Sequence, residues 1–110
     1  MWYYISAMND MTVCTSFPPE LLDFIRAIGS ESRMKILLLF LDGQERTVNQ
    51  IAEAIGLGQP TTSEHLAIMK RSGVLASTKD GKEVYFCPDR GHIILFLETF
   101  SALLKDCCKV

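Results

Sequence analysis

The side chains best suited to binding chemistry lie in one short polar run near the middle of the chain. Within seven residues this run offers amide, hydroxyl, carboxylate and imidazole groups, carried by Gln59, Thr61, Thr62, Ser63, Glu64 and His65. Such groups hydrogen-bond to the base edges of a DNA major groove when a helix presents them there. The run therefore predicts a DNA-reading surface, provided that the neighbouring sequence forms the required helix.

The residues around the run predict two helices joined by a tight turn. Thr47 and Gln50 have the spacing of a capping box, and Gly56 can adopt the positive φ that ends a helix, which places the first helix at 47–55. Pro60 suits the first turn of a second helix, which Gly73 ends. The pair has the form of a helix-turn-helix, in which the second helix enters the major groove.

A β-hairpin is predicted directly after these helices. The runs 75–79 and 83–87 are rich in strand-forming residues, and the turn sequence Asp80-Gly81-Lys82 between them is typical of a tight hairpin. Lys79 and Lys82 lie at its end, where lysines contact phosphates and position a protein without reading sequence. The hairpin is therefore interpreted as a wing beside the reading helix.

Three segments of the chain, 30–37, 59–66 and 79–86, together resemble the ArsR/SmtB family of winged helix-turn-helix regulators. The resemblance implies a mainly α fold with a small β-hairpin, with five helices and a two-stranded wing. It also implies a homodimeric transcriptional repressor that leaves operator DNA when an inducer binds. The expected DNA-binding residues are then Gln59, Thr61, Thr62, Ser63, Glu64, His65, Lys70, Lys79 and Lys82.

Length and charge are compatible with that hypothesis. The 110 residues, 48% of them hydrophobic, can form one small core. The net charge is −2, but residues 59–82 carry an excess of two positive charges, whereas residues 1–45 carry an excess of three negative ones. The basic end is thus the one with the polar run, and affinity for DNA is expected to depend on hydroxyl groups, helix N-termini and two copies of the site as well as on lysines.

The last helix is predicted at 90–107, capped by Asp89. A stripe of apolar residues at helical spacing runs along it: Ile93, Phe96, Leu97, Phe100, Leu103, Leu104 and Cys107. We expect it to form a symmetric dimer seam with the first helix, which contains Leu21, Leu22, Phe24, Ile25 and Ile28; the alternative is that it only closes the monomer core. A dimer would place two reading helices about 34 Å apart, which predicts a pseudo-palindromic operator in double-stranded DNA.

Outside the dimer helices, residues 30–42 predict a buried central helix that Gly43 ends. We expect residues 1–16 to form an N-terminal arm and residues 17–110 to form the DNA-binding and dimerisation domain, with Met1, Met8 and Met11 as candidate starts. No apolar run approaches the 20 or so residues that span a bilayer, and the N-terminus lacks the basic start of a signal peptide. We therefore expect a cytoplasmic protein without membrane partners.

The cysteines supply a separate hypothesis about an inducer. Cys14, Cys107 and Cys108 are soft ligands at the expected dimer junction, where they could bind arsenite or another thiophilic metal ion, or oxidise. Neither of the family's best-known metal sites is complete here, since Thr47-Val48-Asn49 stand at the thiolate site and Arg90 and Leu103 replace two expected zinc ligands. Apolar or incidental roles for all four cysteines, Cys87 included, are the alternative.

Two other functions remain as alternatives. A winged-helix regulator without metal or redox sensing would use the same DNA-binding residues. A winged helix can also act as a protein-docking module, which the acidic balance permits. An enzyme is not indicated, because neither His65 nor His92 lies beside a nucleophile in a triad pattern and no glycine-rich phosphate loop occurs.

Overall fold

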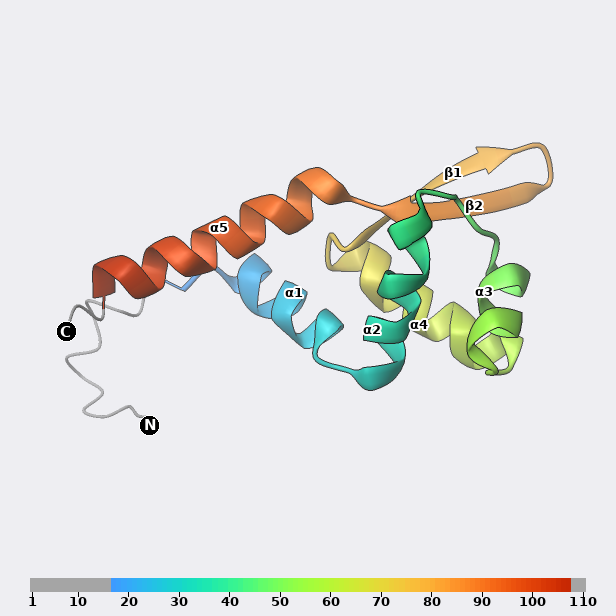
Figure 1. Cartoon of the computed structure of the whole chain (residues 1–110), viewed down its shortest axis with the longest axis horizontal. Helices are drawn as coiled ribbons and strands as arrows, with labels where there is room; N and C mark the ends of the chain where they lie inside the picture. Colours follow the sequence, from blue (N-terminus) through green and yellow to red (C-terminus); the bar gives the residue numbers. More distant parts are fainter. Residues whose placement is uncertain (1–16, 108–110) are drawn as a thin grey trace.

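The protein is described by a computed structural model, which covers residues 17–107. Within that range the chain forms the five α-helices and the two-stranded antiparallel sheet that the sequence predicted, and one 3-10 turn in addition. In chain order the elements are α1 (Pro19–Ile28), α2 (Glu31–Leu39), η2 (Phe40–Asp42), α3 (Val48–Ile55), α4 (Gln59–Arg71), β1 (Leu75–Asp80), β2 (Glu83–Pro88) and α5 (Arg90–Cys107). Figure 1 shows α5 extending away from the wing with α1 beside it, and the molecule is elongated, measuring 52 × 24 × 20 Å.

The helix-turn-helix is formed by α3 and α4, and its local signals are those read in the sequence. The Thr47 hydroxyl accepts from the Gln50 amide at 3.3 Å, and the Gln50 side chain accepts from the Thr47 amide at 2.9 Å. This reciprocal capping box fixes the start of α3. Gly56 ends the helix with a φ of 76°, a left-handed conformation that most side chains avoid. The predicted bounds of both helices are therefore confirmed.

One hydrophobic core lies beneath the helix-turn-helix. Its fully buried members come from the helices α1 to α4, from the residue before β1 and from the start of β1. The largest apolar ones are Leu21, Phe24, Ile36, Ile51, Leu66, Met69, Val74 and Leu75. Because α4 contributes Leu66 and Met69 to this core, its opposite side is left to solvent. The core therefore determines which face of α4 is available for contacts with a partner.

The wing is the antiparallel pair β1 and β2, in register from Leu75 opposite Pro88 to Asp80 opposite Glu83. The strands are one residue longer at their ends than predicted, so the connecting loop is Gly81-Lys82 rather than Asp80-Gly81-Lys82. A single bridge joins the wing to the segment before α3, because the Arg46 and Phe86 backbones exchange two hydrogen bonds of 3.1 and 2.8 Å. The wing is thus attached to the helix-turn-helix by backbone pairing as well as by packing.

The central segment 30–42 is less buried than predicted. Ser30 caps α2 and Gly43 follows with a φ of 82°, as expected, but the α-helix ends at Leu39 and continues as the 3-10 turn η2. Ile36 and Phe40 are buried, whereas Leu38 and Leu41 are exposed. The prediction of a helix buried on every side was therefore wrong for the single chain, since only one side of this segment faces the core.

The two helices expected at a dimer seam differ in how much apolar surface they expose. In α1, Leu21 and Phe24 belong to the monomer core, so their assignment to the seam was wrong; Leu22 is the exposed large apolar residue of this helix. In α5, by contrast, no described side chain is buried, and five large apolar residues are exposed: Ile94, Leu95, Leu97, Phe100 and Leu104. The packed side of α5 consists of Ile93, Phe96 and Leu103, which lie only partly buried against the core.

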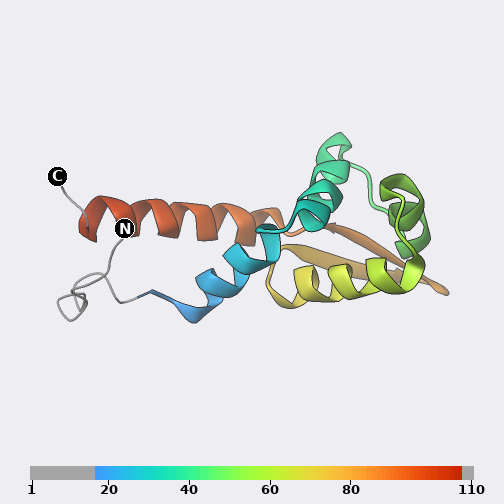
Figure 2. The same ribbon diagram turned by 90° about the horizontal axis from the view of Figure 1, so that it is seen from below.

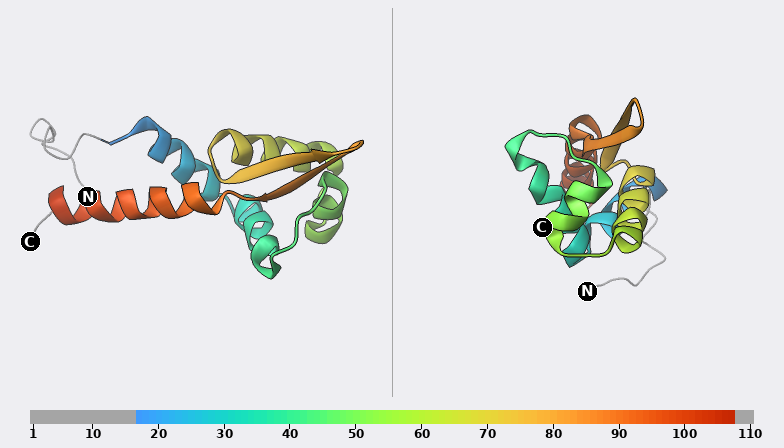
Figure 3. Two further views of the ribbon diagram at one scale, coloured as in Figure 1. Left: turned by 90° about the horizontal axis from the view of Figure 1, so that it is seen from above. Right: turned by 90° about the vertical axis from the view of Figure 1, so that its right-hand side faces the viewer.

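A close contact lies where α5 meets the corner between α4 and β1. Gly73, at the corner between α4 and β1, has a φ of 81°, and a Cβ there would lie 3.2 Å from the Phe96 ring. Phe96 in turn packs against the Phe24 ring at a centroid distance of 5.0 Å. In the views of Figure 2 and Figure 3 the wing tip and the first turn of α4 lie at one end of the molecule, and the end of α5 lies at the other. Within residues 17–107 no helix has the length and apolar character needed to cross a membrane.

Candidate nucleic-acid interface

The exposed face of α4 carries most of the polar run. Gln59, Thr61, Ser63 and Glu64 are exposed in the first two turns, and Lys70 and Arg71 are exposed in the last turn. Gly58 stands at the N-cap and makes no side-chain bond to the first turn, so the first amide groups of the helix are not capped by it. The face therefore combines hydroxyl, amide and carboxylate groups with a helix N-terminus, where an anion is favoured.

Thr62 does not belong to this face, and its prediction as a DNA contact is corrected. Its side chain is 0% exposed, and its hydroxyl donates to the Gly58 carbonyl oxygen at 2.9 Å. A buried hydroxyl that already bonds to the preceding turn cannot reach a base edge. Thr62 instead lies on the core side of α4, together with Leu66 and Met69.

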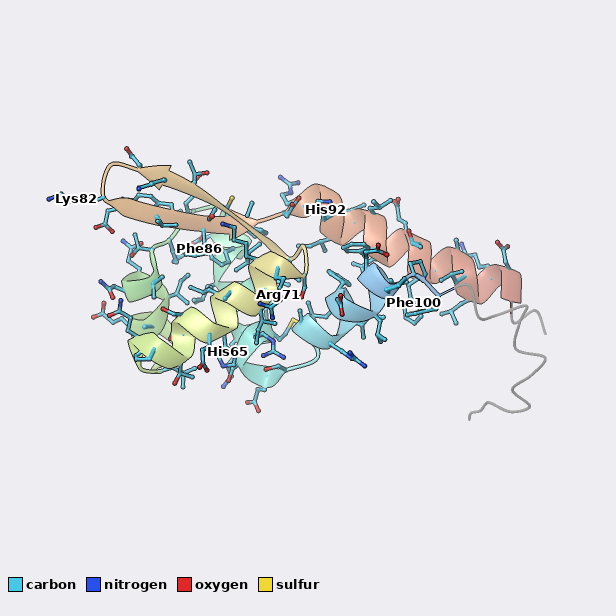
Figure 4. All side chains as sticks on the ribbon, turned by 180° about the vertical axis from the view of Figure 1, so that it is seen from behind. His65, Arg71, Lys82, Phe86, His92 and Phe100 are labelled. Carbon is cyan, nitrogen blue, oxygen red and sulfur yellow. The ribbon has the colours of Figure 1, made fainter. Side chains whose placement is uncertain are left out.

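His65 lies at the border between the exposed and the buried side of α4. It is half-buried, and its Nδ1 atom is 3.2 Å from Nη1 of Arg33 in α2. Figure 4 shows His65 on the part of α4 that lies next to α2. The polar run predicted His65 as a DNA contact, whereas a histidine at the edge of a helix face can also bond inside the domain. The structure gives His65 an internal partner through one ring nitrogen, and the other ring nitrogen has no bond within residues 17–107.

The wing presents its lysines away from the core. Lys79 near the end of β1 and Lys82 in the loop are both exposed, and Figure 4 shows Lys82 at the wing tip, far from Phe100 on α5. The tip and the first turn of α4 are at the same end of the molecule (Figures 2 and 3). A duplex that met the exposed face of α4 would therefore have the wing lysines beside it.

Sequence reasoning missed three arginines that the fold brings together. Arg26 of α1, Arg33 of α2 and Arg71 of α4 line one cleft, together with Asp23 at its acidic edge. They are distant in the sequence, and only the packing of α1 and α2 against α4 makes them neighbours. The cleft adds positive charge at the C-terminal end of α4, where Lys70 was the predicted DNA contact and Arg71 entered only the charge balance of residues 59–82.

The junction between the wing and α5 contains a hydrogen bond between the side chains of Asp89 and His92. The Asp89 carboxylate lies 2.6 Å from Nδ1 of His92 and accepts weakly from the His92 amide at 3.4 Å, which confirms Asp89 as the cap of α5. The hydrogen bond from the His92 side chain holds the pKa of Asp89 below its usual value. His92 also stacks on Phe96 at a ring distance of 5.9 Å. These contacts stabilise the first turn of α5 at the point where it leaves the wing.

The cysteine hypothesis falls mostly outside the described residues. Cys14 and Cys108 are not described, and Cys107 ends α5 but its side chain is not described. Cys87 is a free thiol in β2, and partial burial, with Glu45 and Asp89 nearby, raises its pKa, so that the unreactive protonated form is favoured. Among residues 17–106 no three histidine, cysteine or acidic side chains are grouped closely enough to hold a metal ion.

The chain is similar to known bacterial regulatory proteins. Residues 30–77 match the family model of the bacterial regulatory proteins of the arsR family. A "probable mercury resistance operon repressor" of Streptomyces lividans is 31% identical over 101 residues, covering 86% of this chain and 79% of that protein. The cadmium resistance transcriptional regulatory protein CadC of Listeria innocua is 38% identical over 68 residues, which are 62% of this chain and 57% of CadC. The chain thus spans less than two thirds of CadC.

The fold is also found among solved structures. The homodimeric winged helix-turn-helix DNA-binding domain of a possible ArsR-family regulator from Mycobacterium bovis superimposes with a TM-score of 0.65 and is 22% identical, covering 92% of this chain and 89% of that one. At this identity the likeness concerns the fold. It confirms the predicted arrangement of five helices and a two-stranded wing as a winged helix-turn-helix.

Proposed function

The chain belongs to the bacterial arsR family of regulatory proteins, and we propose that it is a homodimeric, sequence-specific transcriptional repressor that binds a pseudo-palindromic operator in double-stranded DNA. The observation that carries this proposal is the exposed polar face of α4, which the core on its other side holds in place. Its relatives are named as repressors and regulators of metal resistance. The expected location is the cytoplasm, where the DNA is.

Direct readout is assigned to the first turns of α4. Gln59, Thr61, Ser63 and Glu64 are exposed there and have no side-chain hydrogen bond to the rest of the described chain, so each can bond to a base without breaking an internal contact. Gln59 offers the amide that pairs with adenine, and Glu64 can accept from the amino group of cytosine. The hydroxyl groups of Thr61 and Ser63 suit either base edges or phosphates.

Phosphate contacts are assigned to the lysines. Lys79 and Lys82 on the wing and Lys70 at the end of α4 are exposed, and none of them takes part in an ion pair within residues 17–107. Lysines of this kind increase affinity for all sequences alike and make binding dependent on salt. Because the net charge of the chain is −2, attraction to DNA depends on where these lysines lie and not on the total charge.

Dimerisation is assigned to α5, with Leu22 of α1 at its side. Five exposed large apolar residues on one helix would be an unusual surface for a monomer, and a second copy of the same helix is the partner that would cover them symmetrically. The Mycobacterium bovis domain with the same fold is described as homodimeric. Two copies would present two α4 helices to successive major grooves of one duplex face.

The experiment compares two substitutions on a duplex selected by the wild-type protein from a random pool. Thr61→Ala is expected to relax sequence preference by about 1–3 kcal/mol at one base pair of each half-site. Lys79→Ala is expected to weaken selected and random duplexes equally and to lower the salt slope by about one. Ser77→Ala, on a partly buried strand position, is the control. Equal losses on selected and random DNA from Thr61→Ala would exclude Thr61 as a base-reading residue.

Release from the operator by a thiophilic ion is proposed as the regulatory chemistry. Support comes from the soft-donor character of Cys14, Cys107 and Cys108, from the position of residue 107 at the end of α5, and from the named mercury and cadmium functions of the relatives. Arsenite, a zinc salt and a mild oxidant should be titrated against the DNA complex of the wild type and of each Cys→Ser variant. If none of the three reagents weakens the wild-type complex, this regulation is absent.

A further inference from the structure

Arg33 joins three helices through one guanidinium group. From α2, its Nε donates to the Ala27 carbonyl oxygen at 2.6 Å and its Nη2 donates to the Arg26 carbonyl oxygen at 3.2 Å, both at the C-terminal end of α1. Its Nη1 lies 3.2 Å from Nδ1 of His65 in α4. Three directed bonds to two other helices leave the guanidinium group little freedom, because its five donors have a fixed planar geometry.

The chemistry of this contact determines where His65 carries its proton. A guanidinium group has donors and no acceptor, so Nδ1 of His65 must be the acceptor in the bond to Arg33. In a neutral imidazole one nitrogen accepts and the other donates, so the proton is then on Nε2. Arg33 thereby selects one tautomer of His65 and also limits rotation of the ring.

His65 lies where an Nε2–H donor could reach bound DNA. The side chain is half-buried at the edge of the exposed face of α4, one turn after Thr61 and next to Glu64, both of which are exposed. Its Nε2 atom has no partner within residues 17–107. A lone N–H donor at this edge matches acceptors on a duplex, such as the N7 atom of a purine or a phosphate oxygen, and does not match the amino groups of adenine and cytosine.

We propose that Arg33 is a positioning residue that holds His65 as the Nε2–H tautomer, so that His65 donates one hydrogen bond to an acceptor on bound DNA. The part concerning DNA rests on the proposed function, whereas the part concerning the tautomer concerns the free protein alone. Arg33 acts through His65 and does not itself read the duplex. The two parts are tested separately, so that failure of one is distinguished from failure of the other.

The tautomer is tested by NMR on the free protein with ¹⁵N-labelled histidine. Two-bond and three-bond correlations of the ring distinguish an Nε2–H from an Nδ1–H imidazole, and the assigned His65 signals at a pH where the ring is neutral are expected to show Nε2–H. Arg33→Gln should move them toward a mixture of tautomers. Arg26→Gln removes a positive charge from the same cleft but leaves its backbone carbonyl for Arg33, so it should leave the pattern unchanged.

The wild-type spectrum alone decides which tautomer His65 adopts, even if Arg33→Gln does not fold. An Nδ1–H pattern or an even mixture in the wild type would overturn the assignment. A wild-type Nε2–H pattern that survives in folded Arg33→Gln would remove Arg33 as its cause. Neither result depends on whether the protein binds DNA.

The contact with DNA is tested by two substitutions that separate the ring nitrogens. In His65→Gln the amide nitrogen reaches the place of Nε2 and keeps a donor toward the duplex. In His65→Asn the shorter side chain keeps an acceptor for Arg33 but offers nothing at Nε2. On the selected duplex, His65→Asn is expected to lose about two- to tenfold in affinity, the effect of one neutral hydrogen bond, and His65→Gln to lose less.

The acceptor is identified by modified duplexes. Single 7-deazapurines remove one N7 acceptor at a time, and single methylphosphonate linkages remove one charged phosphate. At one position the wild type should lose affinity and His65→Asn should lose none further, and the type of modification distinguishes a base from a phosphate contact. If each modification lowers the affinity of His65→Asn as much as it lowers that of the wild type, His65 makes no such contact. If the wild type binds no duplex, the proposed function fails and the tautomer result still stands.

Discussion

The part of the chain that would read DNA and the part that would pair two chains differ in how completely one chain packs them. Among the described residues, all large buried apolar side chains lie in residues 19–88, here called the head, and the best packed, such as Ile36 and Ile51, are 0% exposed. In α5 no side chain of residues 90–106 is buried, and Leu97 is 51% exposed. The head has its own core, whereas α5 exposes surface that a second copy would cover.

This difference indicates how a small domain can divide its work. The packed head keeps the exposed face of α4 in a defined orientation. The exposed apolar face of α5 would then join two heads, so that two α4 helices face the same duplex. The two regions meet where Gly73 approaches Phe96 and where Asp89 caps α5. A change in how two α5 helices pack would therefore alter the spacing of the two α4 helices.

The largest effect should come from disrupting the α5 pairing without affecting the head. Leu97→Glu places a carboxylate on the exposed apolar stripe and is expected to give a folded monomer. Loss of the second site should reduce operator affinity by about 10²- to 10⁴-fold. Sedimentation and DNA titration measure the two effects. Lys105→Glu, at an exposed polar position of α5, is the control, and a dimeric Leu97→Glu would show that this face is not the seam.

A cavity in the core of the head should lower the stability of the head itself, whereas Leu97→Glu should leave it folded. Leu66→Ala removes a side chain that is 1% exposed and is expected to lower the free energy of unfolding by about 2–5 kcal/mol. Chemical denaturation at several protein concentrations measures this loss. Leu41→Ala makes the same change at a residue that is 80% exposed and should cost less than about 0.5 kcal/mol. Equal losses from the two variants would mean that residues 19–88 have no well-packed core.

A smaller effect is expected at the start of the helix-turn-helix. Thr47→Ala removes the hydroxyl that accepts from the Gln50 amide and should lower the free energy of unfolding by about 0.5–2 kcal/mol. Asn49→Ala changes an exposed residue in the same turn that makes no capping bond, so no comparable loss is expected. Thermal unfolding of both variants measures the difference. Its absence would show that the capping box does not stabilise the head.

The smallest effect concerns acid stability of the head. A hydrogen bond from Arg46 lowers the pKa of Asp42 from 3.8 to about 2, so the ionised carboxylate stabilises the folded chain. This contribution is present above the ordinary pKa and is lost as the pH falls from about 4 toward 2. Asp42→Asn should therefore flatten the pH dependence of stability in that range. Glu53→Gln removes an exposed carboxylate of α3 and keeps the Asp42–Arg46 pair; an identical profile for both variants would contradict the assignment.

Local signals in the sequence were sufficient for the elements that form the head. The capping box at Thr47, the glycine at position 56 and the alternating strands on either side of Gly81 depend on neighbouring residues, and these predictions were confirmed. The spacing of Thr62, Leu66 and Met69 along α4 would also have indicated a buried threonine. The residue type, a hydroxyl in a polar run, led to the wrong assignment.

The remaining features depend on packing between distant segments. Arg33 and His65 are 32 residues apart, and no local pattern predicts that their side chains meet. The six apolar residues from Ile36 to Leu41 indicate a helix near the core but do not indicate which side faces it, and for this reason Leu38 and Leu41 were wrongly expected to be buried. Likewise, the spacing of Leu21 and Phe24 along α1 is compatible with a dimer seam and with a monomer core. Only the position of α1 in the folded chain shows that they belong to the core.

The molar mass of the complex with DNA tests the central claim most directly. Light scattering should be measured on the wild-type protein with its selected duplex, and with the same duplex after five base pairs are inserted between the half-sites. Two chains per duplex are expected, in a complex that weakens with salt and is lost when the insertion turns one half-site to the opposite face. A single chain per duplex, or an affinity that the insertion does not change, would contradict the presentation of two α4 helices by a symmetric pair.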